Sequence, residues 1–159
     1  MKIKTVLDPV LHKKARPVRE DEFGPQLEAY MRQMLVVMHR ANGVGLAAPQ
    51  VSDSRRILVM QPNKAYLMVN PIITSKSEAT AARREGCLSV PGKDLSVTRP
   101  ESVTVEWQDP QGQAHKEVFT GWAATVVQHE IDHLNGVTLV EKMGKFTRSR
   151  YMKKLKKRK

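Results

Sequence analysis

The segment Gly121–Gly136 constrains the fold more than any other, because it places four ionisable side chains in a stretch that otherwise predicts a buried helix. Its apolar residues run between the two glycines without a proline and lie around the whole helical circumference, the pattern of a helix inside a core. At about 100° per residue, His129 and His133 lie roughly 40° apart on one face. Glu130 projects beside them.

Imidazoles and carboxylates are costly to bury unless they are paired or bound to a metal ion. Residues 129–133 match H-E-x-x-H, in which two imidazole nitrogens coordinate one ion and the carboxylate takes a proton from water. Two core histidines satisfied by hydrogen bonds are the alternative interpretation. The segment predicts a divalent metal site with hydrolytic chemistry.

At 159 residues, with 40% apolar residues, the chain is long enough for one domain with a substantial core. It has no signal segment and no long apolar run, so we expect a soluble protein that is neither secreted nor bound to a membrane. A single cysteine, Cys87, excludes an internal disulfide and fits a reducing compartment.

The net charge of +11 is concentrated at the C-terminus. Residues 142–159 hold ten Lys and Arg and no acid, which leaves 17 basic against 16 acidic groups in residues 1–141. This distribution argues against a basic surface over the whole protein. A solvated charged end is the usual fate of such a run, and a terminal helix is the alternative.

The rest of the chain predicts short elements around the histidine helix. We expect an extended arm over residues 1–20, a helix over 25–40, strands over 57–61 and 66–69, and a hairpin over 103–119. A polar loop precedes Glu85. The expected fold is α+β, with small antiparallel sheets packed around a central buried helix and a basic C-terminal helix. We expect a catalytic domain over residues 1–144 and a basic tail over 145–159.

The run Gly43–Gln50 formally matches the dinucleotide-binding pattern G-x-G-x-x-A. That pattern requires a strand before it and a helix after it, whereas here a predicted helix precedes and strand-like residues follow. We therefore exclude a dinucleotide site. The two glycines instead allow the backbone to approach a ligand or another strand closely.

Two histidines need at least one more protein ligand. The sequence offers Cys87, Glu85, Asp132 and three further histidines, His12, His39 and His115. Histidines in an arm, at a polar helix end or in a hairpin are usually solvated. Cys87 is favoured because a thiolate is a strong ligand and the extended segment around it is short and bounded by glycines.

Three separate segments together resemble the peptide deformylase family: Gly43–Gln50, Glu85–Ser89 and Gln128–His133. Their order and spacing agree with that family, and the resemblance runs from the N-terminal arm to about Glu141. It implies the fold described above and an enzyme that removes the N-formyl group from the N-terminal formylmethionine of nascent polypeptides, releasing formate.

The resemblance also implies the chemistry of the site. It implies one divalent metal ion, ferrous iron in cells, with zinc, nickel or cobalt as alternatives in purified protein; the ligands would be Cys87, His129 and His133. Glu130 would accept a proton from water and return it to the departing amine. The side-chain amide of Gln50 and the backbone N–H of Leu88 would stabilise charge on the formyl oxygen.

For the substrate, the resemblance implies that Val44 and Gly45 offer backbone groups to an extended peptide. By position, the pocket for the methionine side chain would be bordered by Arg83, Glu85, Trp122, Thr125 and Val126. Asp132 is expected to pair with Arg99, as in relatives. Asp94 departs from the usual bacterial residue at its loop position, which leaves peptide contacts beyond the methionine open.

Two other functions remain as alternatives. A zinc endopeptidase would share H-E-x-x-H, but it typically draws a third ligand from downstream, where Glu141 is the sole acid. Because a deformylase acts on nascent chains, the tail, residues 145–159, would dock the enzyme on ribosomal RNA through phosphate contacts. A catalytically silent ribosome- or RNA-binding factor would keep the fold and use the same tail. We expect formylmethionyl peptides as substrates and a bacterial cytoplasm, or an organelle after removal of a transit peptide, as the compartment.

Overall fold

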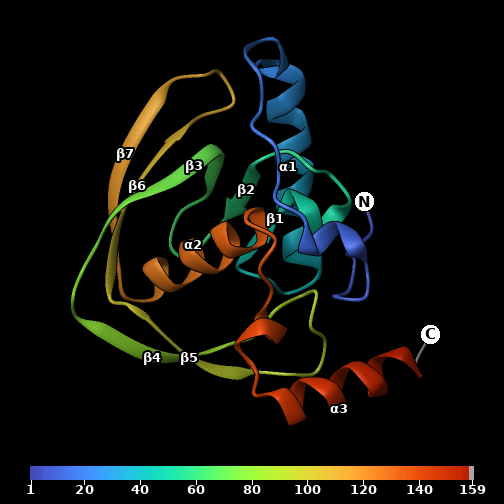
Figure 1. Cartoon of the computed structure of the whole chain (residues 1–159). Helices are drawn as coiled ribbons and strands as arrows, with labels where there is room; N and C mark the ends of the chain where they lie inside the picture. The colour runs from blue at the N-terminus through green and yellow to red at the C-terminus, as the bar shows by residue number, and fades with distance from the viewer. Residues whose placement is uncertain (158–159) are drawn as a thin grey trace.

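The computed structural model describes residues 1–157, and Figure 1 shows the histidine helix crossing the middle of the molecule. The α-helices are α1 (Pro25–Arg40), α2 (Gly121–Leu134) and α3 (Lys145–Lys156). Short 3-10 helices are η1 (Pro9–His12), η2 (Glu20–Glu22), η3 (Ala48–Val51) and η4 (Leu139–Lys142).

All strand pairs in the two sheets are antiparallel. The larger sheet contains, in spatial order, β1 (Gly45–Ala47), β2 (Ile57–Met60), β3 (Tyr66–Lys76), β6 (Ser102–Gln108) and β7 (Ala114–Thr120). The smaller sheet contains β4 (Thr80–Glu85) and β5 (Leu95–Pro100). The predicted α+β class, with a central buried helix and a basic C-terminal helix, is confirmed.

The predicted first helix forms where the sequence places its signals. Pro25 occupies the first turn, and Met31, Met34 and Met38 are fully buried on one face. The chain leaves the helix through Asn42, whose φ of 56° is left-handed.

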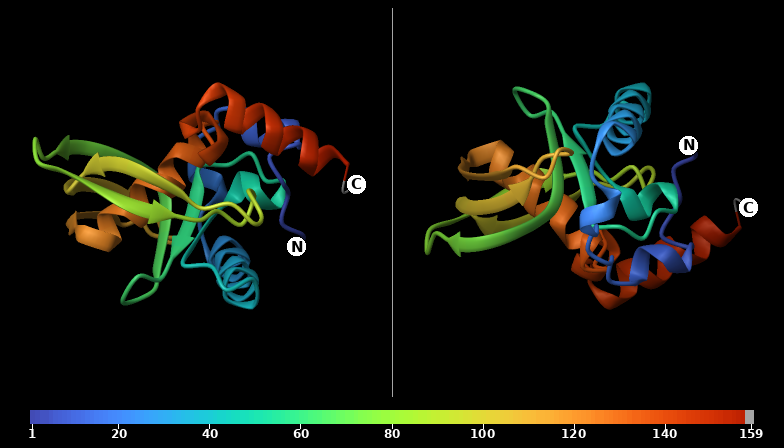
Figure 2. Two further views of the ribbon diagram at one scale, coloured as in Figure 1. Left: turned by 90° about the horizontal axis from the view of Figure 1, so that it is seen from below. Right: turned by 90° about the horizontal axis from the view of Figure 1, so that it is seen from above.

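Strand β2 is buried on both of its faces. Leu58 and Met60 pack in the core with α2, whereas Ile57 and Val59 pack in the core with α1. Because a strand turns successive side chains to opposite faces, a fully apolar run is what a strand between two helices requires. The two further views show α1 and α2 on opposite sides of this part of the sheet (Figure 2).

Strand β3 is longer than predicted. The sequence predicts a strand over 66–69, since an Asn-Pro pair follows and usually marks a turn. The strand instead continues to Lys76, with a shift in register between Val69 and Ile72. Asn70 has a φ of 51°, and proline has no N–H to give to a ladder, so both residues fit a β-bulge. The sequence signal for a turn was real, but it marks a bulge.

The expected polar loop before Glu85 is strand β4, paired along its length with β5. All of its residues before Glu85 are exposed or partly exposed, and they are Arg, Ala and Thr, so apolar alternation does not reveal the strand. The sequence prediction was wrong here because this sheet has only two strands and little apolar surface.

The N-terminal arm runs along the body as predicted, with η1 as its one turn of helix. The N–H of Lys4 donates to the carbonyl of Gln50 at 2.8 Å, and the N–H of Val6 donates to the carbonyl of Ser89 at 3.0 Å. The arm therefore joins two of the three segments that the sequence selects as functional. Within the described part of the chain, none of the helices combines the length and apolar character needed to cross a lipid bilayer.

Candidate metal centre and active site

The thiol of Cys87, in the loop after β4, lies beside the two imidazoles of α2. The ligand atoms of Cys87, His129 and His133 all lie within 4.8 Å of one another. The Cys87 Sγ is 3.3 Å from the His133 Nε2, and the two imidazole centroids are 5.0 Å apart with planes at 70°. The donor set is one thiol and two imidazoles, which suits a divalent transition metal.

The two histidines are buried, at 9% and 1% exposure for His129 and His133. Burial, followed by the charges of His129 and Arg99, holds the pKa of His133 well below its usual value, which favours the neutral form that binds metals. The Nδ1 of His133 has no hydrogen-bond partner among residues 1–157.

A buried charged network orients the first histidine. Glu85 is 2% exposed, and its Oε2 lies 2.9 Å from the His129 Nδ1. Arg99 donates to the same carboxylate from Nε at 2.5 Å and from Nη2 at 3.0 Å. With Nδ1 engaged in this way, the Nε2 of His129 is left for the metal site.

The protonation states follow from these contacts. Burial raises the pKa of Glu85, but hydrogen bonds from His129 and Arg99 prevail and hold it below its usual value. Burial lowers the pKa of His129, but Cys87 and Glu85 outweigh it and raise that pKa well above the ordinary range. The predicted pair between Asp132 and Arg99 is confirmed, with Nη1 donating to Oδ2 at 2.9 Å.

Glu130 lies beside the donor set and is 4% exposed. Burial raises the pKa of its carboxyl group to about 7, and its Oε2 has no hydrogen-bond partner in the described part of the chain. A carboxyl group whose pKa is close to neutral pH can both accept and return a proton. A Cβ atom added at Gly45 would collide with this carboxylate, so the glycine gives Glu130 its space.

The side chain of Gln50, 1% exposed, links the glycine segment to the cysteine segment. Its Oε1 accepts from the N–H of Ala47 at 2.8 Å, and its Nε2 donates to the Ser89 hydroxyl at 3.0 Å. The same Nε2 is 3.9 Å from the Cys87 Sγ. The amide nitrogen is therefore held next to the sulfur.

These groups open into a cavity of about 480 Å³. Its lining includes most of the residues that the sequence selects: Val44, Gly45, Gln50, Cys87, Leu88, Trp122, His129 and Glu130. Trp122 is 44% exposed, and the lining also includes Pro91 and Gly92.

Four residues expected at the methionine pocket are not among those that line this cavity, and their place at that pocket stays a prediction. Val126 is packed in the core between α2 and the sheet, and Thr125 donates its hydroxyl to the carbonyl of Gly121 at 3.3 Å. Glu85 faces His129, and Arg83 forms an ion pair with Glu101 at 2.8 Å. Val126 shares a helical side with the histidines and packs against residues of the sheet.

Sequence reasoning missed two contributors to the site. It did not assign Glu85 as the partner of His129, although metal-binding histidines usually give their second nitrogen to a carboxylate or carbonyl. It also did not assign Ser89, the partner of the Gln50 amide. Both have the same sequence signal, since Glu85 and Ser89 lie in the same short motif as the sulfur.

Comparisons with known proteins agree with this arrangement. A sequence profile of the family described as polypeptide deformylase matches residues 1–149. The chain is 41% identical to a peptide deformylase of Chlorobium luteolum over 160 residues, covering 96% of this chain and 83% of that protein. It is 39% identical to a peptide deformylase of Thermotoga petrophila over 155 residues, covering 97% and 93%.

Solved structures are also similar. The actinonin-bound class I type b peptide deformylase of Acinetobacter baumannii gives a TM-score of 0.86 at 38% identity, covering 91% of this chain and 98% of that one. The peptide deformylase of Thermus thermophilus gives a TM-score of 0.85 at 39% identity, covering 95% and 90%.

Proposed function

Because this chain belongs to the peptide deformylase family, its activity is removal of the N-formyl group from peptides, and we propose that Cys87, His129 and His133 hold the metal ion of that reaction. The resemblance seen in three sequence segments is thereby confirmed at the level of the family and its function. The roles of individual residues are supported by the geometry described above.

The donor set fits a divalent ion of borderline softness. Ferrous iron is our proposal for the cell, with zinc, nickel or cobalt in purified protein, because one thiolate and two imidazoles accept all four. When bound, such an ion supplies Lewis-acid activation of water and of the formyl carbonyl. Elemental analysis of protein purified without oxygen is expected to give about one ion per chain, and iron far below the other metals would contradict the proposed ion.

The proton transfers belong to Glu130. Its carboxylate accepts a proton from the attacking water as the C–O bond forms at the formyl carbon. It then returns the proton to the departing amine as the C–N bond breaks, so that formate and a free amino terminus result. The observation that carries this role is a buried, unpartnered carboxylate oxygen in the cavity wall, beside the donor set.

The remaining polar groups bind and orient the substrate. In this proposal the Gln50 amide and the Leu88 N–H donate to the formyl oxygen as it gains charge, which is supported by the presence of both residues in the cavity lining. Val44, 41% exposed, and Gly45 offer backbone groups to an extended peptide that adds to the edge strand β1. Trp122 borders the first side chain of the substrate at the mouth.

Substituting Glu130 tests the catalytic assignment. Wild-type protein prepared anaerobically should release formate from a formylmethionyl peptide, and Glu130→Gln should lower kcat by about 10²–10⁴-fold, the usual contribution of a general base. Because Gln is nearly isosteric, metal content and circular dichroism should not change. Turnover that survives at the wild-type rate would remove Glu130 from the mechanism.

We further propose formylmethionyl nascent chains as substrates, a catalytic domain over residues 1–144 and a ribosome-binding basic tail over 145–159. Bacterial relatives support a bacterial cytoplasm as the compartment, and an organelle is the alternative. Residues 145–156 form α3, whereas residues 158 and 159 lie outside the described residues. The tail contains no acidic residue, which suits ribosomal RNA.

Removing residues 145–159 tests this partner. Cosedimentation with ribosomes at low salt should be lost, and binding by the full chain should weaken steeply as salt is raised, because phosphate contacts release counterions. Formate release from a short peptide serves as the control for folding. Unchanged cosedimentation of the truncated chain at low salt would end this part of the proposal.

A further inference from the structure

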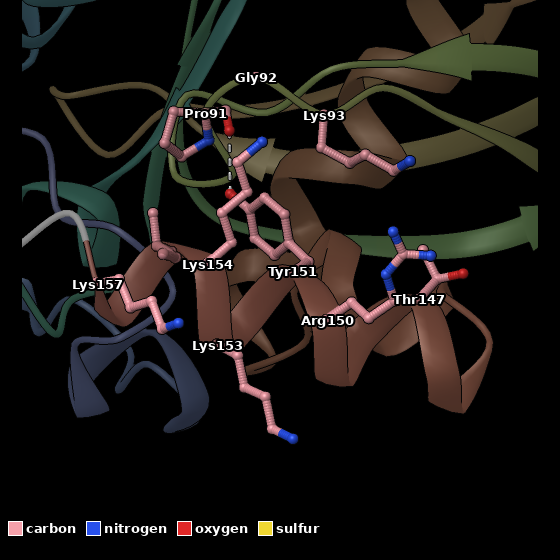
Figure 3. Close-up of a pocket in the computed structure, with 10 residues that line it drawn as sticks. Pro91, Gly92, Lys93, Thr147, Arg150, Tyr151, Lys153, Lys154 and Lys157 are labelled. Atoms are coloured by element: carbon pink, nitrogen blue, oxygen red, sulfur yellow. Dashed lines mark hydrogen bonds between the residues drawn. The ribbon is translucent and has the colours of Figure 1, made fainter.

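A second concavity lies outside the metal centre, between α3 and the segment Pro91–Lys93 (Figure 3). It measures about 780 Å³. The Tyr151 hydroxyl donates to the carbonyl of Pro91 at 3.1 Å and closes its base. Leu155, 8% exposed, anchors the helix in an apolar cluster that includes Val90. We refer to this concavity as the basic groove.

The lining of the basic groove is cationic. Five of the ten lining residues are basic and none is acidic; the basic ones are Lys93, Arg150, Lys153, Lys154 and Lys157. No acidic group among residues 1–157 forms an ion pair with any of these five.

The neighbouring cations differ in this respect. Arg148 on the same helix pairs with Glu141 at 3.3 Å, and Lys142 before it lies 3.8 Å from Asp132. Like charges gathered in a concave surface create a positive potential that favours an anionic ligand. In Figure 3 the Lys154 side chain extends toward the Pro91–Gly92 segment.

The basic groove adjoins the substrate cavity. Pro91 and Gly92 line both, and the loop that contains them also supplies Cys87 and Leu88 to the metal centre. An extended peptide advances about 3.3 Å per residue, so a few residues beyond the methionine are enough to carry a chain past this shared wall. Exposed Pro91 and Gly92 leave that route open.

We infer that the basic groove is a subsite for acidic side chains of the substrate polypeptide, located downstream of the methionine. The inference rests on the proposed substrate cavity and adds a specificity to it. The shared wall favours a polypeptide over a nucleic acid, because a peptide held in the substrate cavity can continue past Pro91 and Gly92 to this surface. Three cations of α3 do not line the groove: Arg148, which pairs with Glu141, and Lys145 and Lys156, which remain for other contacts.

The test uses the metal-loaded full chain and peptides of the form formyl-Met-Ala-Ser followed by a pair of Glu or a pair of Gln, moved one position at a time. At low ionic strength, the best Glu peptide should exceed its Gln counterpart by about three- to tenfold in kcat/KM, the size expected of two exposed ion pairs. The ratio should approach one at high salt.

Two variants that each remove two charges from α3 make the comparison specific. Arg150→Gln with Lys154→Gln should abolish the preference and leave the Gln peptides unaffected. Lys145→Gln with Lys156→Gln, both exposed and outside the groove, should retain it. Equilibrium binding of the same peptides to Glu130→Gln protein gives the same ratio without turnover, so a failure of the catalytic proposal does not decide this one.

A Glu peptide that is never preferred would overturn the inference, as would a preference that persists in the groove variant or disappears equally in the control. If the groove variant instead loses binding to a ribosomal RNA fragment while the peptides show no preference, the surface serves nucleic acid and the inference is wrong.

Discussion

At the scale of residues, the active site depends on close approaches that leave no room for a Cβ atom. Gly45 lies against the Glu130 carboxylate, and Val44 and Gly45 both line the substrate cavity. Burial raises the pKa of the same carboxyl group to about 7. Glycine is therefore needed at position 45 to leave space for the Glu130 side chain, in addition to any contact with substrate.

Gly45→Ala is expected to displace Glu130 and to lower kcat by about 100-fold, the effect of a misplacement of roughly 1 Å at a reacting group. The fold should persist, because only a side chain has to move. Gly144→Ala is the matched control, since nothing lies within 4 Å of a Cβ atom there. Steady-state kinetics with circular dichroism on both variants provides the measurement; equal activity in both would refute the steric argument.

At the scale of elements, α2 packs against the hairpin formed by β6 and β7. Phe119 on β7 is 2% exposed and meets the rings of Tyr66 at 5.2 Å and Trp107 at 6.0 Å. The preceding residue, Val118, is 60% exposed on the opposite face. Alternation along β7 thus separates one core residue from an exposed neighbour.

Phe119→Ala should destabilise the protein by about 3–5 kcal/mol through lost burial and an unfilled cavity. Val118→Ala should change the free energy of unfolding by less than about 0.5 kcal/mol, as for most surface positions. Urea unfolding of the two variants checks the difference. Similar losses would mean that the register of β7 is not the one described.

At the scale of the whole molecule, the two large cores lie on either face of the sheet, and the metal centre is built where α2, the loop after β4 and the start of β1 converge. The N-terminal arm ties two of these parts together by backbone hydrogen bonds. A metal ion held by Cys87 and the two histidines of α2 would join segments that are far apart in sequence. Such an ion should stabilise the folded state.

Removing the metal ion with a chelator is expected to lower stability by about 3–4 kcal/mol when the ion is at roughly 100–1,000 times its Kd. For a chain of this length that corresponds to a fall in Tm of about 10 °C. Adding the ion back should restore the Tm. Cys87→Ala protein should show little or no shift with chelator, and an unchanged wild-type Tm would argue against a resident ion at Cys87.

Much of this protein follows from sequence alone. The apolar run with two histidines and a glutamate predicts a buried helix with a metal site, because period and residue chemistry are local properties. The run of methionines from 31 to 38 likewise predicts α1, and the charge count locates the basic element at the C-terminus. The residues themselves also favour Cys87 as the third ligand. The family resemblance added Gln50 and Leu88, which have no local signal of their own.

Tertiary structure alone decided the contacts between distant residues. Glu85 could have bordered the substrate or bound the metal, and only the pairing of β4 with β5 places Arg99 to hold it against His129. Val126 shares a side of the helix with the histidines, yet the sheet covers it. The basic tail becomes one wall of a groove because Leu155 and Tyr151 dock it on the loop of the sulfur ligand. Local patterns determine which face of an element is apolar, whereas what lies against that face depends on how the rest of the chain packs.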